Sequence, residues 1–188
     1  MKRLAVYCGS SPGADPAFAE AARALGAEMA RRDIGLVYGG GRLGLMGIVA
    51  DAVLSAGGEA YGVIPQALID LEVAHTGLTE LHVVQTMHER KARMTDLTDA
   101  FVALPGGIGT LDELFEAWSW NALGYHAKPF GLLNVGGFWD NLVELMDHVM
   151  ESGFMSPARR AQLLVASEIG EAIDMLDAAV GAERRMVW

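Results

Sequence analysis

Short apolar runs alternate with longer segments of helical periodicity along the whole chain. The apolar runs predict strands at residues 3–8, 34–38, 60–64, 81–85, 101–104, 131–134 and 163–166. The segments between them predict helices at residues 15–32, 45–55, 87–97, 110–123, 138–151 and 169–180, and residues 66–79 predict a short helical piece at most. This alternation predicts an α/β fold, a doubly wound parallel sheet with helices on both faces.

Length and charge narrow the range of partners. The 188 residues fit one domain spanning 1–188, and 52% apolar residues suit a well-packed core. A net charge of −10 disfavours nonspecific binding to nucleic acid or to an anionic membrane. The single cysteine, Cys8, excludes an internal disulfide and fits a reducing compartment such as the cytoplasm. The first apolar run is too short for a signal peptide or a membrane span.

Glycine-rich loops follow several of the predicted strands, at residues 9–13, 39–44 and 106–110. In a doubly wound sheet, such loops meet beyond the carboxyl ends of the strands, where ligands bind. The last loop lies in LPGGIGTLDELFE, where Gly106, Gly107 and Gly109 can expose backbone N–H groups and Thr110 is expected to open a helix. Free N–H groups at a helix start attract anions, so the sequence predicts a phosphate-containing ligand.

Two other cofactor sites fit the glycine loops poorly. The pattern of Gly39, Gly41 and Gly44 matches G-x-G-x-x-G, but it follows the second predicted strand, and the third strand ends without the carboxylate that would bind a ribose. An NAD-type oxidoreductase therefore remains a weak alternative. A P-loop is excluded because no lysine precedes Thr110. The five histidines show no metal-ligand spacing, so we expect neither a metal nor a cofactor.

The charged residues near the predicted site admit two interpretations each. Arg90 and Lys91 lie near the start of a helix, where Arg90 could clamp a phosphate, or the helix could present a solvated face with Glu89 and Arg93 paired. Glu113 could be catalytic, or it could form a capping box with Thr110. Asp112 and Glu113 are adjacent on a helix, so at most one of them is expected to face a reacting atom.

Two motifs carry a family resemblance. MHERKARM at residues 87–94 and PGGIGTLDE at residues 105–113 resemble the MHxRKxxM and PGGxGTxxE motifs of the Lonely Guy family of cytokinin-activating phosphoribohydrolases. The resemblance extends over nearly the whole chain, through CGSSPG, YGGGRLGLMG, GVIP and KPFGLLN. It implies a Rossmann-like homodimer that cleaves the N-glycosidic bond of an N6-substituted adenosine 5′-monophosphate to the free base and ribose 5-phosphate.

The resemblance also implies roles for individual residues. Arg90 and Glu113 match the catalytic pair. The implied nucleotide contacts are Glu72, Lys91, Gly106, Gly107, Ile108, Gly109, Thr110, Gly40 and Gly41. Ile108 replaces a frequent tyrosine, Asp112 a frequent glutamate, and Arg93 a residue that is often acidic or small. Because Arg93 lies one helical turn from Arg90, the preferred N6 substituent stays open.

The sequence leaves open whether the ligand is cleaved or only bound, and which surface would form a dimer. The main alternative to a hydrolase is a carrier that binds a nucleotide or a phosphate-containing cofactor in the same glycine loops without cleaving it. The homodimer is implied by the resemblance alone, although Trp118, Trp120 and Leu123 lie on one predicted helix and could form a contact face. Packing of these residues in the core is an equally good explanation.

Overall fold

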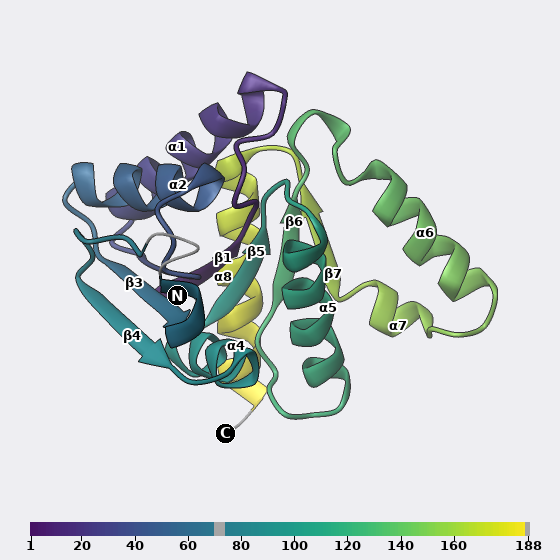
Figure 1. Ribbon diagram of the computed structural model, residues 1–188. Helices are drawn as coiled ribbons and strands as arrows, with labels where there is room; N and C mark the ends of the chain where they lie inside the picture. The colour runs from purple at the N-terminus through teal and green to yellow at the C-terminus, as the bar shows by residue number, and fades with distance from the viewer. Residues whose placement is uncertain (70–73, 187–188) are drawn as a thin grey trace.

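The computed structural model describes residues 1–69 and 74–186. Within these residues, one parallel sheet has the strand order β4-β3-β2-β1-β5-β6-β7 (Figure 1). The strands are β1 (Arg3–Tyr7), β2 (Gly35–Tyr38), β3 (Ala60–Pro65), β4 (Glu80–Val84), β5 (Ala100–Ala103), β6 (Phe130–Leu133) and β7 (Leu163–Ala166). The predicted doubly wound fold is confirmed.

Helices cover both faces of the sheet (Figure 1). Apolar side chains of α1 (Pro16–Arg31), α2 (Gly44–Ser55) and α8 (Ile169–Met186) pack in one hydrophobic cluster. Those of α4 (Met87–Leu97), α5 (Ile108–Ala122) and α6 (Asp140–Glu151) pack in a second cluster on the other face. None of the helices in the described part of the chain is long and apolar enough to cross a bilayer.

The short helices were the least predictable elements. The 3₁₀ turn η1 (Gln66–Leu68) lies in the stretch where a short helical piece was expected. The apolar pattern did not predict the 3₁₀ turn η2 (Val135–Gly137) or helix α7 (Pro157–Arg160). Four residues are too few to show a helical period. A local signal does exist, because the Ser156 side chain caps the Arg159 N–H and a proline occupies the first turn.

The position of β1 decides where a ligand can bind. The chain runs from β1 outward to β4, then returns to place β5 on the other side of β1. Helices α1 and α5, which follow these two neighbouring strands, therefore leave the sheet on opposite faces. Such a switch in direction opens a crevice at the carboxyl ends of the strands. Here that crevice is lined by the glycine loops after β1 and β5.

Candidate active site

The glycine loops after β1, β2 and β5 meet at the carboxyl edge of the sheet. The backbone N–H of Gly9 donates to the carbonyl of Pro105 at 3.1 Å, and Leu45 N–H donates to the Gly9 carbonyl at 3.0 Å. Gly44, at a φ of +60°, lies so close to the Ser10 backbone that a Cβ there would overlap it. Glycine is therefore required at residue 44, where the loop after β2 crosses the loop after β1. A cavity of about 280 Å³ lies between the loops after β1 and β5.

Helix α5 presents its N-terminus to open space. It begins at Ile108, with Gly107 as the N-cap, and the Ile108 side chain is 82% exposed. A Cβ built on Gly107 or Gly109 would meet no atom within 4 Å. The N–H groups of the first helical turn have no partner within the helix. They and the positive end of the helix dipole therefore offer an accessible anion site.

The predicted helix start at Thr110 and its capping box with Glu113 are wrong. Thr110 is the third residue of α5, so it cannot be the N-cap. Its side chain is buried and lies over Gly106, where a Cβ would overlap the Thr110 hydroxyl. The hydroxyl thus packs back against the loop, and Glu113, one turn into the helix, is not the N3 partner of a Thr110 cap.

Arg90 is buried and directed at the end of a neighbouring strand. Its side chain sits in α4 and is only 4% exposed, and its Nη2 donates to the carbonyl of Gly39 at 3.0 Å. Glu89 accepts a hydrogen bond from the N–H of Gln85 at 2.7 Å, beside the Thr86 N-cap. The solvated helix face considered above is therefore wrong for Arg90, which α4 holds against the carboxyl end of β2.

Gly39 leaves room for this arginine. A Cβ at residue 39 would overlap the Arg90 guanidinium and would lie 3.2 Å from the Met46 sulfur, which needs to shift only slightly. We expect Gly39→Ala to keep the fold but displace Arg90 and lower kcat by about 100-fold, the cost of misplacing a catalytic group by about 1 Å. Steady-state kinetics and a melting curve measure both effects. Gly170→Ala, where the new Cβ makes only an ordinary contact, is the matched control; unchanged kcat in Gly39→Ala would contradict this placement.

Glu113 lies near the end of β1. Burial raises the pKa of the Tyr7 hydroxyl, and the charges of Glu113 and Glu116 raise it further. Burial also raises the pKa of the Cys8 thiol, with a second contribution from Glu113. Glu113 lies in α5, which follows β5, and Arg90 lies in α4 with its guanidinium against the carbonyl of Gly39 after β2. Strand β1 lies between β2 and β5 in the sheet, so both residues belong to elements next to the carboxyl end of β1.

Lys91 is engaged by acidic residues of α5. Its Nζ donates to Asp112 Oδ2 at 3.1 Å and makes a close ion pair with Glu116 Oε2. Burial lowers the pKa of Lys91, but the hydrogen bonds and charges of Glu116 and Asp112 outweigh burial, and the pKa is raised overall. The ammonium is therefore charged and links α4 to α5.

Comparison with known proteins identifies the family. A family model described as "Possible lysine decarboxylase" matches residues 46–176. A cytokinin riboside 5′-monophosphate phosphoribohydrolase of Rhodococcoides fascians is 46% identical over 92% of this chain and 87% of its own length. The chain belongs to the Lonely Guy family. The enzyme named LOG7 of Arabidopsis thaliana is likewise 46% identical, over 94% of this chain and 82% of its own.

The family resemblance of the two motifs is thus confirmed. A more distant likeness concerns the fold alone. The Moco carrier protein of Chlamydomonas reinhardtii superimposes with a TM-score of 0.71, at 19% identity, over 96% of this chain and 98% of that one. At such low identity, this match bears on the architecture alone and gives no support to the carrier alternative.

The other family positions lie around the second glycine loop. Gly40 is buried at a φ of +78°, and its carbonyl accepts the His75 N–H at 2.9 Å. Gly41 forms an isolated bridge with Ala74. These two contacts hold the second glycine loop against residues 74 and 75, which follow β3 in the chain. Glu72 lies outside the described residues.

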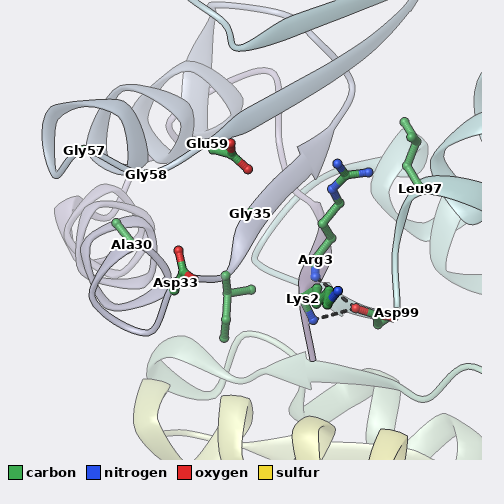
Figure 2. Close-up of a pocket in the computed structure, with 11 residues that line it drawn as sticks. Lys2, Arg3, Ala30, Asp33, Gly35, Gly57, Gly58, Glu59, Leu97 and Asp99 are labelled. Atoms are coloured by element: carbon green, nitrogen blue, oxygen red, sulfur yellow. Dashed lines mark hydrogen bonds between the residues drawn. The ribbon is translucent and has the colours of Figure 1, made fainter.

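A second cavity, larger than the one at the glycine loops, lies at the opposite edge of the sheet. Figure 2 shows this hollow, of about 700 Å³, at the amino ends of the strands, with Asp33 and Glu59 on one side and Arg3 on the other. The Asp99 carboxylate accepts the backbone N–H groups of Lys2 and Arg3 at 2.6 and 3.0 Å. Ligands of doubly wound sheets bind at the carboxyl edge. We therefore place the candidate active site at the glycine loops.

Sequence reasoning gave Glu116 no role. The residue was part of the LPGGIGTLDELFE stretch, but its pairing with Lys91 joins positions 25 residues apart in sequence. One signal was available: Asp112 and Glu116 are four residues apart and share a helix face, which is the spacing that lets two carboxylates hold one ammonium.

Proposed function

We propose that this chain hydrolyses the N-glycosidic bond of N6-substituted adenosine 5′-monophosphates and releases the free base, a cytokinin, and ribose 5-phosphate. The observation that supports the proposal is that α4 holds the buried Arg90 against the Gly39 carbonyl at the carboxyl edge of the sheet, where α5, which carries Glu113, also begins. The names of the relatives, which are 46% identical, support the same activity.

The 5′-phosphate is proposed to bind at the start of α5. The backbone N–H groups of Gly107, Ile108, Gly109 and Thr110 face the anion there, and Gly106 lets the loop approach Gly9 closely. Phosphate binding remote from the scissile bond restricts the sugar and positions C1′ for attack. Gly40 and Gly41 complete the loop on the β2 side, and Glu72 remains a proposed contact from the family motif.

Glu113 is proposed to act on the sugar. Cleavage of the C1′–N bond builds positive charge on the ribosyl ring, as in other glycosidic hydrolyses. A carboxylate facing C1′ stabilises that charge and takes a proton from the attacking water. The guanidinium of Arg90 keeps the carboxylate ionised and anchors the substrate, because a nearby positive charge favours the charged form of a carboxyl group.

We also infer that the protein is a cytoplasmic homodimer that needs no cofactor or metal. Apolar side chains of Met87, Ile108 and Phe115 are exposed on α4 and α5, the helices that carry the proposed catalytic residues. The contact face predicted from Trp118, Trp120 and Leu123 does not lie on the surface as a whole, because Trp118 packs in the core whereas Leu123 is exposed. Analytical ultracentrifugation of the wild type and Phe115→Glu tests the dimer; we expect the variant to sediment as a monomer.

Product analysis tests the proposed activity. We expect the pure protein to release adenine from AMP and the free cytokinin from N6-isopentenyl-AMP, with the substituted nucleotide favoured in kcat/KM. Chromatography of the base and a ribose 5-phosphate assay measure both products. A carrier would bind either nucleotide saturably and release no base. Absence of base from both substrates would therefore overturn the hydrolase.

A further inference from the structure

Charged side chains gather between α4 and α5, behind the proposed site. Lys91 follows Arg90 on α4, and its ammonium contacts Asp112 and Glu116, which lie on either side of Glu113 in the sequence. The Lys91 side chain is 9% exposed and that of Glu116 is 19% exposed, whereas Asp112 is largely in solvent. The pair of Lys91 with Glu116 is therefore the desolvated one.

Glu116 is coupled to the catalytic carboxylate through space. Glu113 and Glu116 are three residues apart and share a face of α5, where like charges repel. After burial, the charges of both carboxylates contribute to the raised pKa of Tyr7. The Lys91 ammonium is the positive charge that offsets the second carboxylate.

Burial of the second carboxylate oxygen of Glu116 is unfavourable in free energy. Glu116 Oε1 is buried and has no hydrogen-bond partner among the described residues. Leaving a carboxylate oxygen unsatisfied away from water is unfavourable, and native proteins rarely do so without a functional reason. An apolar contact between the helices would avoid this cost. A role in setting the charge of the site explains why a carboxylate stands there.

We propose that Lys91 and Glu116 form a positioning pair that aligns α4 with α5 and sets the charge around Glu113, without either residue touching the nucleotide. The proposal rests on the hydrolase function and assigns Lys91 a different role from the nucleotide contact implied by the family motif. Among the described residues, the elements around Glu113 carry Arg90 and Lys91 on α4, Asp112 and Glu116 on α5, and Tyr7 and Cys8 at the end of β1. Tyr7 and Cys8 stay neutral near pH 7, because their pKa values are raised.

Opposite charge changes should move the pH profile in opposite directions. Glu116→Gln removes a negative charge beside Glu113, so the acid limb of kcat/KM should move to lower pH. Lys91→Met removes a positive charge, so the acid limb should move to higher pH. Each shift should be about 0.5 unit or more, the lower end of what a nearby charge produces. The double variant, which removes both charges, should titrate close to the wild type.

The kinetic constants separate positioning from binding. We expect Glu116→Gln and Lys91→Met each to lower kcat at least about 10-fold while KM changes less than about 3-fold, because an alignment defect costs transition-state stabilisation. Asp147→Asn, which removes a comparable ion pair with Arg160 far from the site, is the matched control for fold and kinetics. A Lys91→Met variant with a 10-fold higher KM and unchanged kcat would make Lys91 a nucleotide ligand and overturn the proposal.

A titration without substrate makes the test independent of the enzymatic activity. The ¹³C carboxyl resonance of Glu113, assigned with Glu113→Gln, is followed against pH in the wild type and the three variants. We expect the same opposite shifts. Wild-type protein that releases no base would overturn the hydrolase but leave this titration to decide the positioning pair. Equal titration curves in all four proteins would overturn the pair itself.

Discussion

Glu113→Gln is expected to lower kcat by about 1,000-fold and to leave the fold intact. The amide keeps the shape of the side chain but can neither accept the proton of the attacking water nor offset positive charge at C1′, and removal of such a group typically costs 100- to 10,000-fold. Stability should hardly fall, because the substitution also removes the repulsion between Glu113 and Glu116. Initial rates with N6-isopentenyl-AMP and a thermal melt measure the two effects.

A matched substitution controls for the loss of one glutamate charge. Glu144 is exposed on α6, in the cluster of helices opposite α1 and α2, and Glu144→Gln should keep wild-type rates. Binding of AMP to Glu113→Gln should persist, because the phosphate is held by the start of α5. A Glu113→Gln protein that turns over at a tenth of the wild-type rate or faster would remove Glu113 from the chemistry.

Arg90→Ala is the second substitution expected to have a large effect. The guanidinium is buried and donates to the Gly39 carbonyl. Under the proposed mechanism, its loss also removes a substrate anchor and a charge that keeps Glu113 ionised. We expect kcat/KM to fall by about 100- to 1,000-fold and the free energy of unfolding to fall by about 1 to 3 kcal/mol, the cost of a buried carbonyl left without its donor. Kinetics and urea denaturation test the two numbers.

Two further arginine variants sharpen this prediction. Arg90→Lys keeps the charge but lacks the planar fork of donors, so it should recover only part of the activity. Arg159 also donates from Nη2 to a backbone carbonyl, that of Ala122 at 2.9 Å, but on α7. Arg159→Ala should therefore leave kcat/KM unchanged. Full activity in a folded Arg90→Ala protein would contradict the assignment of Arg90.

The architecture was predictable because each strand and long helix carries its own periodic signal. The strand at residues 163–166 was predicted with its observed bounds, and the helix at residues 87–97 likewise. The start of α5 was not, because Thr110 and Glu113 match a capping box locally. In the structure the helix begins at Ile108, and the Thr110 hydroxyl packs over Gly106 instead of capping the helix. The local sequence matches a capping box, but this contact with the loop prevents Thr110 from acting as the cap.

The site was predictable in part. Spacing alone predicted that the glycine loops and Arg90 meet at one edge of the sheet, whereas the catalytic pairing of Arg90 with Glu113 comes from the family motifs and stays a prediction. The need for glycine at residue 39 depends on an arginine 51 residues away, and no local pattern carries it. The engagement of Lys91 by Glu116 likewise follows from how α4 packs beside α5. These are tertiary contacts between segments that lie far apart in the sequence.

A single-turnover reaction in ¹⁸O-labelled water tests the central claim most directly. Enzyme in excess over N6-isopentenyl-AMP should release free base and ribose 5-phosphate in equal amounts, with one labelled oxygen at C1 of the sugar in a rapid quench, before exchange through the open-chain form. Glu113→Gln should bind the nucleotide and release neither product. Saturable binding by the wild type with no release of base, or release without incorporation of ¹⁸O, would contradict hydrolysis at this site.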